Sequence, residues 1–192
     1  MKITIAQFFV LAYLALGPNG VAAAPTLTVE PSLLSVSTGS NFSLVIDVNT
    51  VSDLFAYQFD VDFNPKVLSV SAVTEKSFLA GGGTTFFLPG TIDNVGGSVT
   101  SIADTLLGPG GGVSGTGALV QIDFAAKGSG TSSIDLANFL FLDSTGATIG
   151  VSTQNGTVDA SPASASPEPR FAWLIAIFVI FLKRPRLNFQ RD

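Results

Sequence analysis

The chain has 192 residues, of which 46% are hydrophobic and 12% are charged, so it can form one domain with targeting segments but not two full domains. Histidine and cysteine are absent, which excludes disulfides, Cys/His zinc sites, histidine bases and thiol nucleophiles. The net charge of −5 is unevenly spread: residues 25–160 hold twelve acids and three lysines, a charge of 3 − 12 = −9, which argues against a nucleic-acid partner.

A targeting segment is predicted at the N-terminus. The charged start Met1-Lys2 precedes an apolar run that ends at Leu16, and small residues around Ala23 follow. This order of charged, apolar and small-residue regions is typical of a secretory signal peptide. Residues 1–23 are therefore predicted to be a signal peptide cleaved after Ala23, with a buried N-terminal helix as the alternative.

From Thr26 the chain alternates strand-sized segments with turns rich in glycine and polar residues. Such spacing predicts an all-β fold, a jelly-roll-like β-sandwich of about nine strands over residues 25–159. A short helical turn is expected at Glu75–Leu79. Strands are predicted near Thr26–Glu30, Leu33–Ser37, Asn41–Val51, Leu54–Phe63, Lys66–Val73, Thr84–Leu88, Ser98–Leu106, Gly117–Ala126, Ser132–Leu142 and Thr157–Asp159.

The segment Leu54–Phe63 has the most regular alternation, and strand side chains alternate with a period of two. Large apolar groups therefore share one face, which needs a facing layer, most simply a second sheet. Asn64-Pro65 is expected to end the strand, because proline gives up a ladder N–H. The apolar face holds Phe55, Tyr57, Phe59, Val61 and Phe63, and the opposite face holds Ala56, Gln58, Asp60 and Asp62.

The run from Phe59 to Pro65, FDVDFNP, followed by the VLSV run from Val67 to Val70, resembles the cohesin family, sandwich modules related to bacterial cellulose-binding modules. The resemblance extends over about Leu27 to Val158. It implies a non-enzymatic module for protein–protein interaction, whose outer sheet face meets a dockerin-like partner. By the same resemblance, the expected partner-binding residues are Gln58, Asp60 and Asp62.

Two other functions are left open. A carbohydrate-binding module associated with polysaccharide metabolism is one alternative, although the only tryptophan, Trp173, lies outside the predicted sandwich. A glycoside hydrolase is the other, because two carboxylates about 5–10 Å apart can serve such a reaction. Asp60 and Asp62 meet that distance but lack a reason for different pKa values, so no catalytic residue is assigned.

No metal or cofactor is predicted. Asp60, Asp62 and Asn64 lie on one strand face at successive spacings of roughly 6.6–6.8 Å. Calcium needs about six to eight oxygen ligands, so these side chains would require loop carbonyls or another acid to complete a site. Calcium remains an alternative on those terms.

The glycine-rich segment from Gly110 to Gly115 matches the G-x-G-x-x-G pattern of dinucleotide-binding proteins. That function requires a following helix and a parallel sheet, whereas a strand is predicted at Gly117–Ala126. Residues 108–117 are therefore expected to be a flexible loop. Binding is expected on the polar face of Leu54–Phe63, where side chains are held in fixed positions.

A sorting signal is predicted at the C-terminus, after a flexible spacer over residues 160–166. Pro167-Glu168-Pro169 precedes an apolar run at 171–182, and a basic cluster follows it. This order over residues 167–192 resembles the PEP-CTERM sorting signal. The resemblance implies processing by an exosortase, a membrane enzyme of bacteria that make extracellular polysaccharide.

The apolar run is predicted to be a short C-terminal hydrophobic helix at the membrane, with a buried core helix as the alternative. Its twelve residues measure about 18 Å as a helix, against a hydrocarbon core of about 30 Å. Spanning would therefore need the flanking Arg170 and Lys183 to reach the interfaces, or a thinner bilayer. We expect an exported protein, tethered transiently at the inner membrane and then found at the cell surface or extracellularly.

Overall fold

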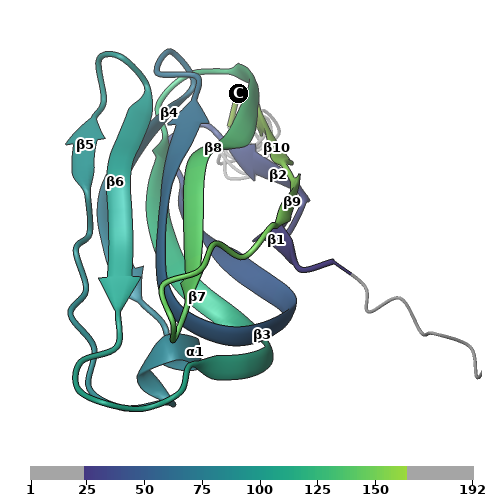
Figure 1. Cartoon of the computed structure of the whole chain (residues 1–192). Coiled ribbons are helices and arrows are strands. Elements are labelled where there is room, and N and C mark those ends of the chain that lie inside the picture. Colours follow the sequence, from purple (N-terminus) through teal and green to yellow (C-terminus); the bar gives the residue numbers. More distant parts are fainter. Residues whose placement is uncertain (1–23, 164–192) are drawn as a thin grey trace, which may run out of the picture.

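The computed structural model describes residues 24–163, and most of them lie in β-strands (Figure 1). The single helix in this part has four residues. The elements are β1 (Thr26–Glu30), β2 (Leu33–Ser37), β3 (Asn41–Phe63), β4 (Leu68–Glu75), α1 (Ser77–Ala80), β5 (Thr91–Asp93), β6 (Ser98–Thr105), β7 (Val113–Ala126), β8 (Gly130–Asp143), β9 (Ser152–Gln154) and β10 (Gly156–Ser161).

The predicted signal peptide at 1–23 and the sorting motif, apolar run and basic tail within 167–192 lie outside the described residues. Strand β10 continues through Ser161, two residues into the predicted spacer. Between residues 24 and 163, no helix has the length and apolar character needed to cross a membrane.

Strand β3 takes part in both layers of the sandwich and curves from one to the other (Figure 1). Its first half pairs with β1 and β7, which gives the order β9-β1-β3-β7-β4. Its second half pairs with β6 and β8, which gives the order β5-β6-β3-β8-β10-β2. The strand bends at Thr50 and Asp53, which both have a φ of 56°.

The core lies between these two layers and is lined by alternate residues of β3. The apolar face predicted for Leu54–Phe63 is confirmed: four of its five residues are buried and Phe55 packs against them half-buried. Aromatic rings join the layers, since Phe63 meets Phe124 of β7 edge-on at 5.7 Å between centroids. Within the second layer, Tyr57 stacks on its cross-strand partner Phe141 of β8 at 5.9 Å. Burial of such rings is a large part of the apolar area removed from water.

Several predicted boundaries were wrong. The strands expected at Asn41–Val51 and Leu54–Phe63 form one bent strand, because pairing with β7 continues across the bend. Residues 84–88 do not form a strand and make only isolated bridges, to Ala103 of β6 and to Leu106 just after it. Strand β7 begins at Val113, inside the predicted loop 108–117. The three-residue strands β5 and β9 were not predicted, because both depend on a neighbouring strand rather than on their own pattern.

Candidate interaction surface

The predicted partner-binding residues lie on the outer surface of the layer that contains β8, β3 and β6. Gln58 and Asp62 are exposed, and Asp60 is half-buried. Strand alternation accounts for this placement, because their neighbours Tyr57, Phe59 and Val61 point into the core. The structure therefore brings all three to one face, although their surroundings differ.

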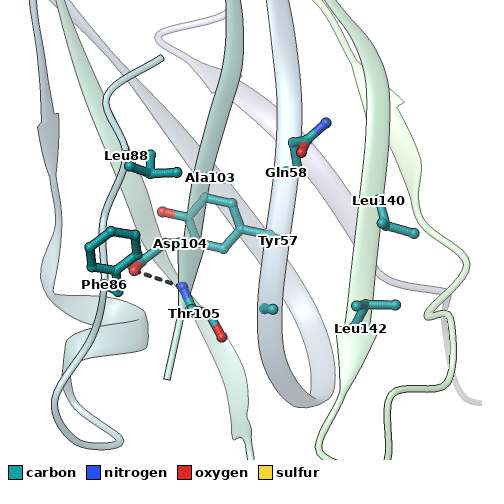
Figure 2. A pocket seen from close by; sticks show the side chains of 10 residues that line it. Tyr57, Gln58, Phe86, Leu88, Ala103, Asp104, Thr105, Leu140 and Leu142 are labelled. Atoms are coloured by element: carbon teal, nitrogen blue, oxygen red, sulfur yellow. Dashed lines mark hydrogen bonds between the residues drawn. The ribbon is translucent and has the colours of Figure 1, made fainter. Parts of the chain in front are cut away.

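Gln58 lies in the middle of an apolar trough of about 210 Å³ (Figure 2). The strand register places Ala103 of β6 on one side of it and Leu140 of β8 on the other. The next row along the strands holds Thr105, Ala56 and Leu142. The floor of the trough is thus made of short or apolar side chains on three hydrogen-bonded strands.

Phe86 and Leu88 form one wall of this trough, opposite Leu140 and Leu142 (Figure 2). Their segment, residues 84–88, runs antiparallel beside β6: the Phe86 N–H donates to the Thr105 carbonyl at 2.8 Å, and the Leu88 N–H donates to the Ala103 carbonyl at 2.8 Å. Three of the rim side chains are exposed, by 55% (Phe86), 47% (Leu88) and 45% (Leu140). Clustered exposure of this kind marks interaction sites more often than scattered apolar residues do.

Asp60 is held by both neighbouring strands, at positions where the ladder is irregular. Its Oδ1 accepts a hydrogen bond from the Ser101 N–H at 2.7 Å, and its Oδ2 accepts one from Asn138 Nδ2 at 2.8 Å. Ser101 and Asn138 have φ values of 59° and 48°, and the register shifts beside Asp60 on both sides. Asp60 therefore stabilises two β-bulges, one in each neighbouring strand, and such bulges bend the strand in which they lie.

The end of the surface beyond Asp60 is acidic. Asp62 of β3 lies directly opposite Asp135 of β8 in the antiparallel register. Asp135 accepts hydrogen bonds from Ser133 Oγ and Asn155 Nδ2, both at 2.7 Å. Like charges directly opposite each other in a sheet are destabilising, so the pair gives this end a negative potential that a basic group would relieve.

The outer surface of the other layer differs, because its polar groups bond to one another. Ser43 Oγ and Gln121 Nε2 donate to Asp123 Oδ1 at 2.6 and 2.8 Å, and Lys76 Nζ donates to Gln121 Oε1 at 3.3 Å. These hydrogen bonds, from Ser43 first and then from Gln121, lower the pKa of Asp123. The polar hollow of about 380 Å³ on this surface is thus lined by side chains that already hydrogen-bond to one another.

No metal site is apparent from residue 24 to residue 163, where no three acidic side chains gather closely enough to hold an ion. Two of the predicted oxygen donors are used in the fold: Asp60 binds the two bulges, and Asn64 Oδ1 accepts the Lys66 N–H at 3.0 Å. The outer surface of β8, β3 and β6 can therefore offer a partner the apolar trough, the Gln58 amide and the carboxylates at its acidic end.

The extent of the sandwich agrees with a comparison to known families. A family model described as the cohesin domain matches residues 27–160. The chain belongs to the cohesin family. Cohesin domains are non-catalytic modules that mediate protein–protein interaction with dockerins.

Solved cohesin structures share this fold. A non-cellulosomal cohesin from the archaeon Archaeoglobus fulgidus superposes with a TM-score of 0.60 at 17% identity, over 72% of this chain and 92% of that one. The third cohesin of ScaC from Acetivibrio cellulolyticus, solved with a ScaB dockerin, gives 0.59 at 16% identity, over 72% and 99%. A type I cohesin–dockerin complex from Clostridium thermocellum gives 0.59 at 13% identity, over 73% and 95%. No curated protein matches the chain.

The trough of this cohesin domain was missed by the sequence analysis, which named Gln58, Asp60 and Asp62 alone. One signal was present: residues 139–142 read Phe-Leu-Phe-Leu, and a strand cannot bury four consecutive side chains on one face. The structure buries Phe141 and leaves Leu140 exposed. For Phe86 and Leu88 no local pattern was available, because their exposure depends on the pairing of 84–88 with β6.

Proposed function

We propose that this cohesin domain is an exported binding module whose partner, a dockerin-like protein, docks on the outer surface of β8, β3 and β6. The observation that supports this most directly is the trough between Phe86/Leu88 and Leu140/Leu142. Its floor is a rigid sheet, so few side chains must be ordered when a partner binds. A polysaccharide partner is the alternative.

The acidic end of the surface indicates the charge of the partner. Asp62 and Asp135 lie opposite each other, and the described part of the chain has an excess of acids. A partner with apolar side chains for the trough and Lys or Arg for the acidic end fits this surface best. Steering by such charges weakens as salt rises.

The location of the domain is proposed from the two ends of the chain. Signal-peptide and PEP-CTERM-like patterns support export, transient tethering at the inner membrane and processing by an exosortase. Release or attachment at the cell surface would follow. The charge order also fits, because basic residues after the apolar run favour a cytoplasmic C-terminus.

Affinity capture from the envelope and extracellular matrix of the producing organism tests the proposal, with the wild type and Leu140→Asp run in parallel. A charge at Leu140 should prevent docking in the trough. Thr74→Asp, on an exposed position of β4 in the other layer, is the matched control. We expect a protein that binds the wild type and the control, and calorimetry should show at least a tenfold loss for Leu140→Asp. Capture of a polysaccharide instead, or equal binding by all three, would contradict the proposal.

A further inference from the structure

Two carboxyl groups from opposite layers lie near each other behind the trough. Glu75 of β4 accepts a hydrogen bond from Thr85, which is bridged to Leu106, and Asp104 of β6 lies two residues before Leu106. Asp104 of β6 is only 2% exposed, and Glu75 of β4 is half-buried. Asp104 Oδ1 accepts the Thr105 N–H at 2.9 Å (Figure 2). Its other oxygen, Oδ2, is buried with no hydrogen-bond partner among residues 24–163. A buried carboxylate oxygen without a donor is costly, and proteins rarely leave one so.

A shared proton would supply the missing donor. Burial raises the pKa of Asp104 to about 7, and the neighbouring Glu75 carboxyl group acts in the same direction. Two carboxyl groups that share a site cannot both ionise easily, so one keeps its proton.

The other groups around the pair do not neutralise it. The Tyr57 phenol of β3 has its pKa raised by burial and by the charges of Asp104 and Glu75, so it stays neutral, and it donates to the Leu119 carbonyl at 3.3 Å. Lys76, beside Glu75 in sequence, donates instead to Gln121. In the described part of the chain, no cation contributes to the pKa shift of Asp104.

The carboxyl pair is connected to the wall of the trough. Thr85 Oγ1 donates to Glu75 Oε1 at 2.6 Å, and Thr85 is bridged to Leu106, the residue that follows β6. The next residues, Phe86 and Leu88, form the wall. If both carboxyl groups ionise, their repulsion should displace Glu75, the more exposed of the two, and remove the anchor of Thr85.

We propose that Glu75 and Asp104 share one proton across the sandwich and that this proton holds the segment 84–88 against β6. The trough is then fully formed under acidic to neutral conditions and loosens under alkaline conditions. The effect on partner binding rests on the proposed function, whereas the effect on the fold does not.

The direction of the pH dependence follows from the two states of the chain. An aspartate in the unfolded chain titrates at about pH 4. Between that pH and about pH 7, the pair in the folded state holds a proton that the unfolded chain has released. Stability from this proton is fully present below the unfolded pKa and is lost as pH rises through the folded pKa.

Urea unfolding of the full 192-residue chain, followed by circular dichroism from pH 5 to pH 8.5, tests the shared proton. Asp104→Asn and Glu75→Gln each replace the shared proton by an amide that donates at every pH. Glu30→Gln, at an exposed position of β1, is the control. Between pH 5 and pH 7 we expect the unfolding equilibrium constant of the wild type to rise with pH, by up to about tenfold per pH unit more than that of Asp104→Asn or Glu75→Gln. The control Glu30→Gln should behave like the wild type.

Hydrogen exchange of the same proteins tests the wall. At pH 8.5 the amides of Phe86 and Leu88 should exchange about tenfold faster in the wild type than in Asp104→Asn, while core amides such as that of Ile46 should differ less. If the unfolding equilibrium constants of the wild type and of Asp104→Asn changed in parallel with pH, the proposal would be wrong. If Asp104→Asn does not fold, the same comparison with Glu75→Gln decides. Stabilisation of the wild type by calcium at pH 8.5 would also overturn the proposal, because the pair would then hold a metal ion. Neither experiment needs the partner, so either can fail independently of the proposed function.

Discussion

At the scale of single residues, Asp60 shows how one surface side chain can serve the fold. Strand alternation predicted the face on which it lies, and the resemblance to cohesins predicted it as a partner contact; the face is the predicted one. Both of its oxygens, however, bind backbone or side-chain donors at the bulges around Ser101 and Asn138. Asp62, two residues later, lies exposed on the same face. Asp60 therefore stabilises the fold, whereas Asp62 is accessible to a partner.

Asp60→Ala is therefore expected to destabilise the domain by about 2 kcal/mol, because hydrogen bonds to charged groups are worth ~1.5–3 kcal/mol each and this site is partly solvated. Asp62→Ala should stay within about 0.5 kcal/mol, as exposed substitutions usually do. Urea titration at pH 7 measures both. Equal losses in the two variants would show that the bulge contacts of Asp60 contribute nothing.

At the scale of elements, Asp53 ties the bend of β3 to two loops. Its Oδ1 accepts the Gly112 N–H at 2.5 Å, and its Oδ2 accepts Ser144 Oγ at 2.6 Å. These bonds, from Ser144 first and then from Gly112, lower the pKa of Asp53. The middle of the glycine-rich segment 108–117 is thereby fixed to the sandwich, which glycine content alone could not indicate.

A methyl group at Gly112 should be poorly tolerated, because its Cβ would lie 2.4 Å from the carbonyl carbon and oxygen of Asp53. Gly110→Ala is the matched control, since no atom lies within 4 Å of the position of its Cβ. We expect Gly112→Ala to lower the free energy of unfolding by ~1–3 kcal/mol, as overpacking does, and Gly110→Ala to have little effect. Thermal unfolding of the two variants side by side provides the measurement, and similar melting temperatures would refute the close approach.

How far the sequence predicts this protein depends on how local each signal is. The inward face of Leu54–Phe63 was predicted correctly, because alternation within a strand is a local property. The strand end at Asn64 was also correct. The continuity of β3, the wall at 84–88 and the pairing of Asp62 with Asp135 were not predicted, because each depends on which distant strand lies alongside. The paired carboxyl groups of Glu75 and Asp104 are 29 positions apart and meet only in the folded sandwich.

At the scale of the whole molecule, the charge distribution separates the chain into an acidic body and a basic end. Residues 25–160 carry −9, whereas the part beyond Pro169 has five basic residues and one acid, 5 − 1 = +4. This separation fits the proposed sorting, in which the tail stays at the membrane and the body outside.

Glu168→Ala is expected to impair C-terminal processing while leaving removal of residues 1–23 intact. Mass spectrometry of the protein from envelope and medium fractions of its host would show this as a precursor that retains its C-terminus. Glu30→Ala, on the exposed end of β1, controls for a general effect of losing an acid. If the mature wild type kept both ends of the chain, the sorting proposal would be wrong.

Strand β3 also has a consequence for how the domain unfolds. It is an interior strand of both layers, so neither layer can lose its ladder without displacing a strand on which the other depends. The two layers should therefore form a single cooperative unit. Native-state hydrogen exchange at increasing urea would report one shared opening free energy for Ile46 in the first half of β3 and Phe59 in the second. Two distinct values would mean that the bend at Thr50 and Asp53 works as a hinge between separate folding units.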